Sequence, residues 1–312
     1  MLNFTLKQLR YVEAAGRLGS IAAAAGELHI SQSSITAAID TLETGLGYDI
    51  FVRTPAKGIQ TTPSGAETLH LIRGFIDQAR HFEAEVTSVG GDTTGLVRIA
   101  CYATAAPSFL PPVLKNITEH FPGISIKLLE GNMATIMDFL NDGEADLVFT
   151  YQESVDDRHE FLPLFAAPPY ALISPQDNLA QQTSVTYAQL AARPMVMLDL
   201  PRTREYFIGM FEGLGLVPNI VHSTRSSEIA RALVAGGFGF SILNIRPPDY
   251  YQNDARYKVL PILDPPHVPL FGIATTARTR QPKLVRTFID SCIRLQDSGT
   301  FRSLIVTEDT NQ

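Results

Sequence analysis

A change of pattern near Gly90 limits the fold of this sequence more than any other feature. Residues 1–90 follow helical periodicity almost throughout, whereas residues 96–300 alternate short β-type runs with helical stretches. A polar, glycine-rich segment at residues 90–95 separates the two patterns, which is typical of a hinge. The 312 residues are therefore expected to form a small helical part and a larger α/β part.

The helical part is predicted to begin with three short helices. Thr5, Ser20 and Ser31 stand where these helices would start, and their side chains can cap free backbone N–H groups. After the third helix, a Pro/Lys/Gly turn lies between two extended runs, which predicts a two-stranded wing. This order predicts a winged helix-turn-helix domain over residues 1–62.

One long helix is expected over residues 63–90. Pro63 occupies its first position, where a missing N–H costs nothing. A helix of this length is about 40 Å long at 1.5 Å per residue. That is too long to pack only on so small a domain, so we expect the helix to dimerise with a second copy. Its apolar residues have the spacing of a coiled-coil seam: Ala66, Leu69, Ile72, Ile76, Ala79, Phe82 or Glu83, Val86 and Val89.

The third helix and the wing carry the residues expected to contact double-stranded DNA. Small polar side chains at a helix N-terminus can bind phosphates and base edges, and basic wing residues can reach phosphate or the minor groove. The alternative is a helical protein-interaction domain whose serines and threonines only cap helices. The candidate DNA-binding residues are Ser31, Gln32, Ser33, Ser34, Thr36, Arg53 and Lys57.

The charge balance counts against strong electrostatic binding of nucleic acid. The formal net charge of the chain is −7, and residues 1–90 contribute −2 of it. Specific DNA binding is therefore expected to depend on helix N-termini, on Arg53 and Lys57 and on oligomerisation, with modest nonspecific affinity.

Residues 91–312 are predicted to form a two-lobed α/β domain. A strand–helix–strand–helix–strand order from residue 96 predicts a parallel sheet with helices on both faces. A second α/β set follows, and a returning strand leads back to the first. Lobe one is expected at about residues 96–166 and 270–300, and lobe two at about 167–269. A ligand would bind between them, at the carboxyl ends of the strands.

The candidate effector-binding residues follow these predicted strands. Arg202 and Arg204 precede a helix and would suit a carboxylate or phosphate, although surface ion pairs, for example with Glu205, explain them equally well. Thr104 could also cap a helix, and Met133 could be core packing. The full set is Ala103, Thr104, Ala105, Asn132, Met133, Pro201, Arg202, Thr203, Arg204, Thr224, Arg225, Asn244 and Phe271, the last expected at the cleft floor.

Signatures of catalysis and of metal binding are missing from the sequence. It has no Gly-x-Ser-x-Gly elbow, His-Glu-x-x-His motif or Walker A sequence, so we expect no enzyme activity, cofactor or metal. Its two cysteines, Cys101 and Cys292, cannot form a disulfide framework, and Cys101 is expected to be a buried small hydrophobe. The apolar runs are too short to span a bilayer and no signal peptide is recognisable, so we expect a cytoplasmic protein.

Residues 1–65 carry a dense set of motifs: Leu9-Arg10-Tyr11, Gly19-Ser20-Ile21, Ala23-Ala24, Leu28-His29-Ile30-Ser31-Gln32-Ser33, Ile39, Leu42-Glu43, Leu46-Gly47, Ile50-Phe51-Val52-Arg53 and Thr61-Thr62-Pro63-Ser64-Gly65. In their order and spacing the sequence resembles the LysR-type transcriptional regulators, and the layout of the remaining chain fits the same family. Ser33 stands where the family usually has proline. Ala37 and Ala38 stand where it often has polar or basic residues, which implies fewer DNA contacts from the third helix.

The resemblance implies a sequence-specific DNA-binding regulator with a periplasmic-binding-protein-like effector domain. Such regulators usually form homotetramers, in which linker helices pair two chains and effector domains pair with other copies. A small-molecule effector, anionic on the evidence of the arginines, would shift the tetramer geometry, the DNA bend and access by RNA polymerase. The residues alone leave a second reading, a small-molecule binding protein whose N-terminal domain binds protein. A cleft enzyme is disfavoured by the missing catalytic signatures.

Overall fold

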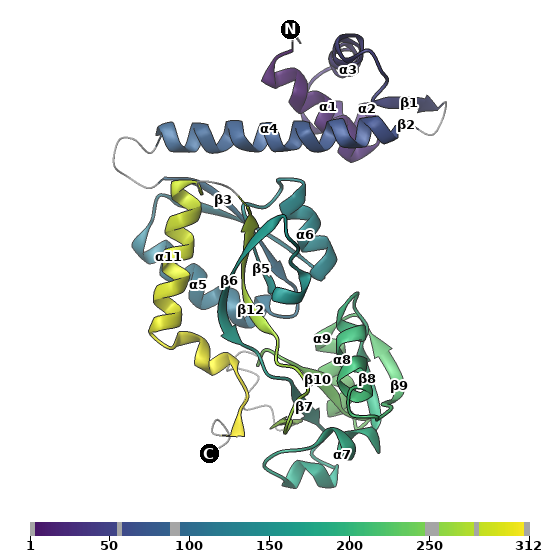
Figure 1. Cartoon of the computed structure of the whole chain (residues 1–312), viewed down its shortest axis with the longest axis vertical. Coiled ribbons are helices and arrows are strands. Elements are labelled where there is room, and N and C mark those ends of the chain that lie inside the picture. Colours follow the sequence, from purple (N-terminus) through teal and green to yellow (C-terminus); the bar gives the residue numbers. More distant parts are fainter. Residues whose placement is uncertain (1–3, 55–57, 88–93, 247–255, 278–280, 309–312) are drawn as a thin grey trace. The chain divides into compact units, whose positions relative to one another are not determined.

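The computed structural model describes residues 4–54, 58–87, 94–246, 256–277 and 281–308. The chain divides into two compact units, Met1–Gly90 and Gly91–Gln312, called here the first and second units (Figure 1). Within the described ranges, no helix is both long and apolar enough to cross a membrane.

The first unit contains three short helices, a two-stranded wing and one long helix. Thr5 closes a capping box with Gln8, and Ser20 and Ser31 each accept a hydrogen bond from a backbone N–H of the helix that follows. These caps are the ones predicted from the sequence, and they fix where the helices begin. The elements are α1 Leu6–Leu18, α2 Ile21–Glu27, α3 Gln32–Leu46, β1 Phe51–Thr54, β2 Gly58–Thr61 and α4 Pro63–Thr87.

A glycine allows α4 to start directly on the body of the winged domain. A Cβ added at Gly65 would lie 2.1 Å from the carbonyl oxygen of Ile50, so a larger residue requires the backbone to move. Thr62 holds the same corner, because its N–H donates to the Ile50 carbonyl at 2.9 Å and its hydroxyl accepts from the Gly65 N–H at 2.9 Å. The first turns of α4 are therefore part of the winged domain.

The packing of α4 corrects the predicted coiled-coil seam. Leu69 and Ile72, expected on the seam, are buried in the core of the first unit with residues of α1 and α3. The small domain needs these side chains to complete its own core, so they are not available to a partner helix. Val89 lies outside the described residues. The apolar residues that α4 exposes are Leu71, Phe75, Phe82 and Val86.

Lobe one of the second unit is built on a five-stranded sheet in the order β4-β3-β5-β12-β6. The first three strands are parallel, as the βαβαβ pattern predicts, and β12 returns antiparallel between β5 and β6. Right-handed crossovers on either side of β3 place α5 and α6 on opposite faces (Figure 1). The bounds are β3 Gly95–Tyr102, α5 Ala106–His120, β4 Ile124–Gly131, α6 Met133–Asn141, β5 Leu147–Tyr151, η2 Gln152–Ser154, β6 His159–Ala166, β12 Leu270–Thr276, α11 Lys283–Asp297 and η4 Thr300–Leu304.

Lobe two contains two small sheets. One has the order β10-β7-β11, and the other is the parallel pair β8-β9, linked to the chain near β10 by a bridge between Met195 and Phe240. The bounds are β7 Tyr170–Ile173, η3 Asn178–Gln181, α7 Tyr187–Ala191, β8 Pro194–Leu198, α8 Thr203–Glu212, β9 Asn219–Thr224, α9 Ser227–Ala235, β10 Ser241–Leu243 and β11 Lys258–Pro261.

Apart from the short 3-10 helices η2, η3 and η4, three of these elements are not predicted from the sequence. The strand β6 contains Pro163, which weakens a strand signal but is tolerated because β6 is the edge of its sheet. The helix α7 has five residues and β11 has four, too few for a clear periodicity.

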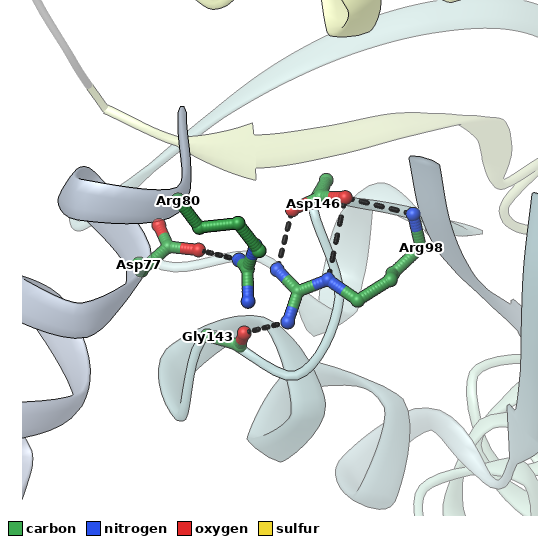
Figure 2. Close-up of polar contacts among 5 residues, drawn as sticks. All are labelled: Asp77, Arg80, Arg98, Gly143 and Asp146. Carbon is green, nitrogen blue, oxygen red and sulfur yellow. Dashed lines mark hydrogen bonds and ion pairs between the residues drawn. The ribbon is translucent and has the colours of Figure 1, made fainter. Parts of the chain in front are cut away.

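A charged cluster ties the loop before β5 to β3 in lobe one. Asp146 accepts three hydrogen bonds from Arg98: Oδ1 accepts from Nη2 at 2.5 Å, and Oδ2 accepts from the backbone N–H at 2.7 Å and from Nε at 3.4 Å (Figure 2). Arg98 Nη1 also donates to the carbonyl oxygen of Gly143 at 2.5 Å. Such charge-assisted, multiply bonded pairs fix geometry strongly. Figure 2 also labels the ion pair of Asp77 with Arg80, one turn apart on α4 of the first unit.

Candidate functional site

The N-terminus of α3 presents a cluster of small polar side chains to solvent. Ser31 Oγ accepts from the Ser34 N–H at 3.3 Å and lies 2.9 Å from the hydroxyls of both Ser33 and Ser34. These three serines and Gln32 are exposed, whereas Thr36 is half-buried. The predicted DNA-binding residues of α3 therefore lie together on one accessible helix end, which suits phosphate and base edges.

The wing carries a basic residue that already has a partner. Arg53 on β1 pairs with the carboxylate of Asp40 on α3, and both side chains are about half exposed. This contact draws the wing toward α3 and partly neutralises the charge expected to meet DNA. Lys57, the other predicted wing residue, lies outside the described residues.

A cavity of about 260 Å³ lies between the two lobes of the second unit. It opens where β3, β4 and β5 end in lobe one and where β8 and β10 end in lobe two. This is the place predicted for a ligand, at the carboxyl ends of the strands. The lining residues are Tyr102, Thr104, Met133, Tyr151, Glu153, Leu198, Arg202, Thr203, Tyr206, Phe207, Leu243, Asn244 and Pro269.

Five of the sequence-predicted effector residues line this cavity: Thr104, Met133, Arg202, Thr203 and Asn244. They come from the loops after β3, β4, β8 and β10, so the strand-end rule brings them together as expected. Thr104 does not cap α5, because the N-cap is Ala105 and it makes no side-chain cap hydrogen bond.

The other predicted effector residues have different positions. The side chain of Asn132 caps α6, and Arg204 pairs with Asp199 at 2.9 Å, a different partner from the expected Glu205. Phe271 is buried behind the ring of Tyr151, 5.2 Å between centroids, so it supports the cavity wall and does not line it. Ala103 and Ala105 lie beside the lining loop but are not lining residues. A separate shallow depression on lobe two contains Pro201, Thr224 and Arg225.

Three hydrogen bonds hold the wall of the cavity. The hydroxyl of Tyr102 lies 3.0 Å from that of Thr203, which joins β3 of lobe one to α8 of lobe two. Asn244 Nδ2 donates to the carbonyl of Ala167 at 2.8 Å and to the hydroxyl of Tyr206 at 3.0 Å. Since Ala167 lies in the crossing between the lobes, Asn244 ties the cavity wall to the hinge.

Three tyrosines give the cavity its chemical character. Burial raises the pKa of Tyr102, Tyr151 and Tyr206, and hydrogen bonding by Thr104 and Thr203 offsets only part of the effect at Tyr102. The hydroxyls therefore stay protonated and act as hydrogen-bond donors at neutral pH. Their rings supply apolar walls for the body of a small ligand.

Charged groups stand at the rim of the cavity on both lobes. Arg202 has a left-handed backbone, with φ 64°, at the N-cap of α8, and its side chain is exposed. Glu153 follows β5 and accepts from His267 Nε2 at 2.5 Å. His267 in turn lies edge-on to the ring of Tyr206, 6.4 Å between centroids.

Eight lining residues were not identified from the sequence: Tyr102, Tyr151, Glu153, Leu198, Tyr206, Phe207, Leu243 and Pro269. Four of them are the last residues of their strands: Tyr102, Tyr151, Leu198 and Leu243. The rule that ligands bind at the carboxyl ends of strands would have found them if it had included the final residue of each strand. The positions of Tyr206 and Phe207 depend on the rotation of α8, which the sequence alone does not fix.

The cysteines are both buried, in β3 and α11. Burial raises the pKa of each thiol, to about 12 for Cys292. Among the residues that the structure describes, no group of three or more His, Cys, Asp or Glu side chains could hold a metal ion.

A winged helix-turn-helix domain joined to a two-lobed domain with a cavity between its lobes defines a class of DNA-binding regulator. Two family models match the chain, one in each of these two domains. Residues 6–66 match the bacterial regulatory helix-turn-helix proteins of the lysR family, and residues 90–296 match the LysR substrate binding domain. The second match alone covers more than half of the chain. The chain belongs to the LysR family of transcriptional regulators.

Individual relatives resemble the whole chain. The HTH-type transcriptional regulator CysB of Haemophilus influenzae is 26% identical over 321 residues, covering 96% of this chain and 97% of its own length. The crystal structure of HinK, a LysR family regulator of Pseudomonas aeruginosa, is 31% identical with a TM-score of 0.61, covering 94% of this chain and 99% of its own. A full-length OxyR of the same species has a TM-score of 0.71 over 93% and 98% of the two chains, and its 22% identity supports the fold alone.

Family membership confirms the expected fold class and the expected function. The protein is a DNA-binding transcriptional regulator with an effector-binding domain, and it is not an enzyme. The second reading, a binding protein whose N-terminal domain only contacts protein, is set aside by the helix-turn-helix match.

Proposed function

We propose that this regulator reads DNA with the N-terminus of α3 and with the wing, and that a small molecule in the interlobe cavity controls it. The observation that carries the proposal is the cavity itself, because it is closed by residues of both lobes and its shape depends on how they meet. A ligand there has different affinities for different lobe arrangements, and that difference is the free energy available for regulation.

The DNA-contacting residues in this proposal are those predicted from the sequence. Exposed side chains at the N-terminus of α3 offer hydroxyl and amide groups, and the helix end itself favours phosphate. Arg53 would exchange Asp40 for a phosphate on binding. Lys57 would add a second wing contact. The α3 contacts would come from Ser31, Gln32, Ser33, Ser34 and Thr36.

The α4 helix is the proposed dimerisation element. Its exposed apolar residues recur at intervals of 4, 7 and 4, which places them on one face of the helix. Two such faces would bury each other, and the dimer would present two winged domains to two DNA half-sites. The α4 face consists of Leu71, Phe75, Phe82 and Val86.

A second interface would join effector domains of different dimers into a dimer of dimers. The edge strand β4 exposes Leu128, and the edge strand β9 exposes Val221 beside Ile229 on α9. Exposed apolar side chains on edge strands are typical of surfaces that pair with another chain. In this assembly the ligand would bias the tetramer geometry, the bend of the DNA and access by RNA polymerase in the bacterial cytoplasm.

An electrophoretic shift with the chain's own upstream DNA, repeated at rising salt, tests this function. We expect a specific shift that survives salt better than binding to unrelated DNA, and that weakens in Gln32→Ala and Arg53→Gln. Glu212→Gln, an exposed change in the second unit, is the matched control. A shift that does not distinguish upstream from unrelated DNA would contradict the proposal.

A further inference from the structure

Two opposite charges line the same small cavity. Arg202, from lobe two, and Glu153, from lobe one, both face a space of about 260 Å³. In the described part of the chain, the Arg202 guanidinium has no hydrogen-bond or ion-pair partner, whereas Glu153 uses Oε1 to bind His267 and leaves Oε2 without a partner. The cavity therefore offers a cation on one wall and a carboxylate oxygen on the other.

The fold uses Glu153 only through its contact with His267, and no hydrogen bond or ion pair engages the Arg202 guanidinium within the described residues. The neighbouring arginine, Arg204, is held by Asp199 at 2.9 Å and does not line the cavity. Arg202 is thus the one guanidinium among the described lining residues. Its left-handed backbone is a conformation that non-glycine residues adopt at a cost, so the turn before α8 gives the side chain a position that ordinary helix geometry would not.

The same cavity is lined by tyrosine hydroxyls that have a hydrogen atom left to donate. Tyr151 is 7% exposed, and within the described residues its hydroxyl makes no hydrogen bond. The hydroxyl of Tyr206 accepts from Asn244, which leaves its own hydrogen to donate. Both hydroxyls can therefore donate a hydrogen bond into the cavity, which favours a ligand that brings acceptor oxygens.

We propose that the effector is a small zwitterion of the amino-acid type, with its carboxylate toward Arg202 and the tyrosine hydroxyls and its ammonium toward Glu153. This inference rests on the proposed function, which places the effector in this cavity. A purely anionic ligand would set its charge against Glu153, and a purely cationic ligand would set its charge against Arg202. A zwitterion pairs both, which offsets the cost of removing these charges from water.

The first test is a thermal-shift comparison on the full-length protein with three pools of small molecules. One pool holds the common α-amino acids, the second the same acids without the amino group, and the third the corresponding amines without the carboxylate. We expect the amino-acid pool alone to raise the melting temperature. Equal stabilisation by the deaminated acids, or no stabilisation by any pool, would overturn the proposal.

The second test uses calorimetry to measure which residue binds each charged group of the ligand. The ligand is the amino acid that raises the melting temperature most. Removing its amino group should weaken binding about tenfold or more in the wild type but not in Glu153→Gln. Removing its carboxylate should likewise weaken binding in the wild type but not in Arg202→Gln. Glu212→Gln and Arg302→Gln, both exposed and away from the cavity lining, are the matched controls.

The outcomes separate this inference from the proposed function. Deaminated acids that bind as tightly as amino acids, with full affinity in Glu153→Gln, would identify a plain anion and leave the cavity as the effector site. A ligand whose affinity is unchanged in Thr104→Phe, where an added ring fills the cavity, would bind elsewhere and overturn both. Thermal unfolding of each variant without ligand shows whether it is folded.

Discussion

The hydroxyl of Tyr102, the last residue of β3, lies 3.0 Å from the hydroxyl of Thr203, the first residue of α8, and this buried hydrogen bond joins the two lobes 101 residues apart in the sequence. Both residues line the interlobe cavity. Any motion that separates the lobes must therefore break the bond and expose two hydroxyls together.

Replacing Thr203 by valine removes the hydroxyl with little change of shape. We expect the free energy of unfolding of the second unit to fall by about 1 kcal/mol, a typical net value for one hydrogen bond. Tyr102→Phe should cost a similar amount. The double variant should cost little more than Tyr102→Phe alone, because that change already removes the bond to Thr203. Urea denaturation followed by circular dichroism measures this, and additive costs would show that the two hydroxyls act separately.

Gly65→Ala should disrupt the first unit. The added methyl would lie 2.1 Å from the Ile50 carbonyl oxygen, so α4 must move from the winged domain. We expect a lower melting temperature and weaker binding of upstream DNA. Gly74→Ala on the same helix is the control, because no atom lies within 4 Å of its added methyl. It should leave binding intact and add up to about 1 kcal/mol of stability, as alanine favours helix.

Phe82→Glu should weaken the dimer. Phe82 is 71% exposed on α4, and a carboxylate there would be buried without a partner if two α4 faces meet. Analytical ultracentrifugation should show a dissociation constant raised about tenfold or more. His70→Glu adds the same charge to an exposed position of α4 outside that face and should not change association. Equal weakening by both substitutions would argue against an α4 interface.

The two cysteines should not react in the folded protein at neutral pH. Burial raises the pKa of Cys292 from 9.0 to about 12 and that of Cys101 further, so both remain thiols. A thiol reagent should label neither residue until denaturant is added. Above pH 9 the unfolded thiols lose protons that the folded thiols keep, so the free energy of unfolding should fall as the pH rises toward 12. Rapid labelling of the native protein at pH 7 would contradict this.

Local chemistry made much of the fold predictable. Thr5, Ser20 and Ser31 mark helix starts because their side chains compete for backbone N–H groups within a few residues. The order of strands and helices also predicts the parallel part of lobe one. The sequence does not show which face of α4 packs into the core of the winged domain. The seam prediction therefore placed Leu69 and Ile72 against a partner helix, whereas the structure buries them in that core.

The interlobe cavity was predictable in its position but not in its chemistry. The strand-end rule locates Thr104, Met133 and Asn244, because it depends only on topology. Contacts such as that of Glu153 with His267, 114 residues apart, depend on how two distant loops meet. No periodicity or local motif in the sequence indicates that these two loops meet, so only the folded structure shows that Glu153 and His267 are in contact.

If Arg53 contacts DNA as proposed, Asp40 is an internal competitor for that contact. Its carboxylate already occupies the guanidinium of Arg53, so a phosphate that reaches the wing must displace an anion of the protein's own. In the proposed function this cost is the same for every DNA that Arg53 contacts. Removing the Asp40 carboxylate should therefore raise the affinity for specific and nonspecific DNA alike.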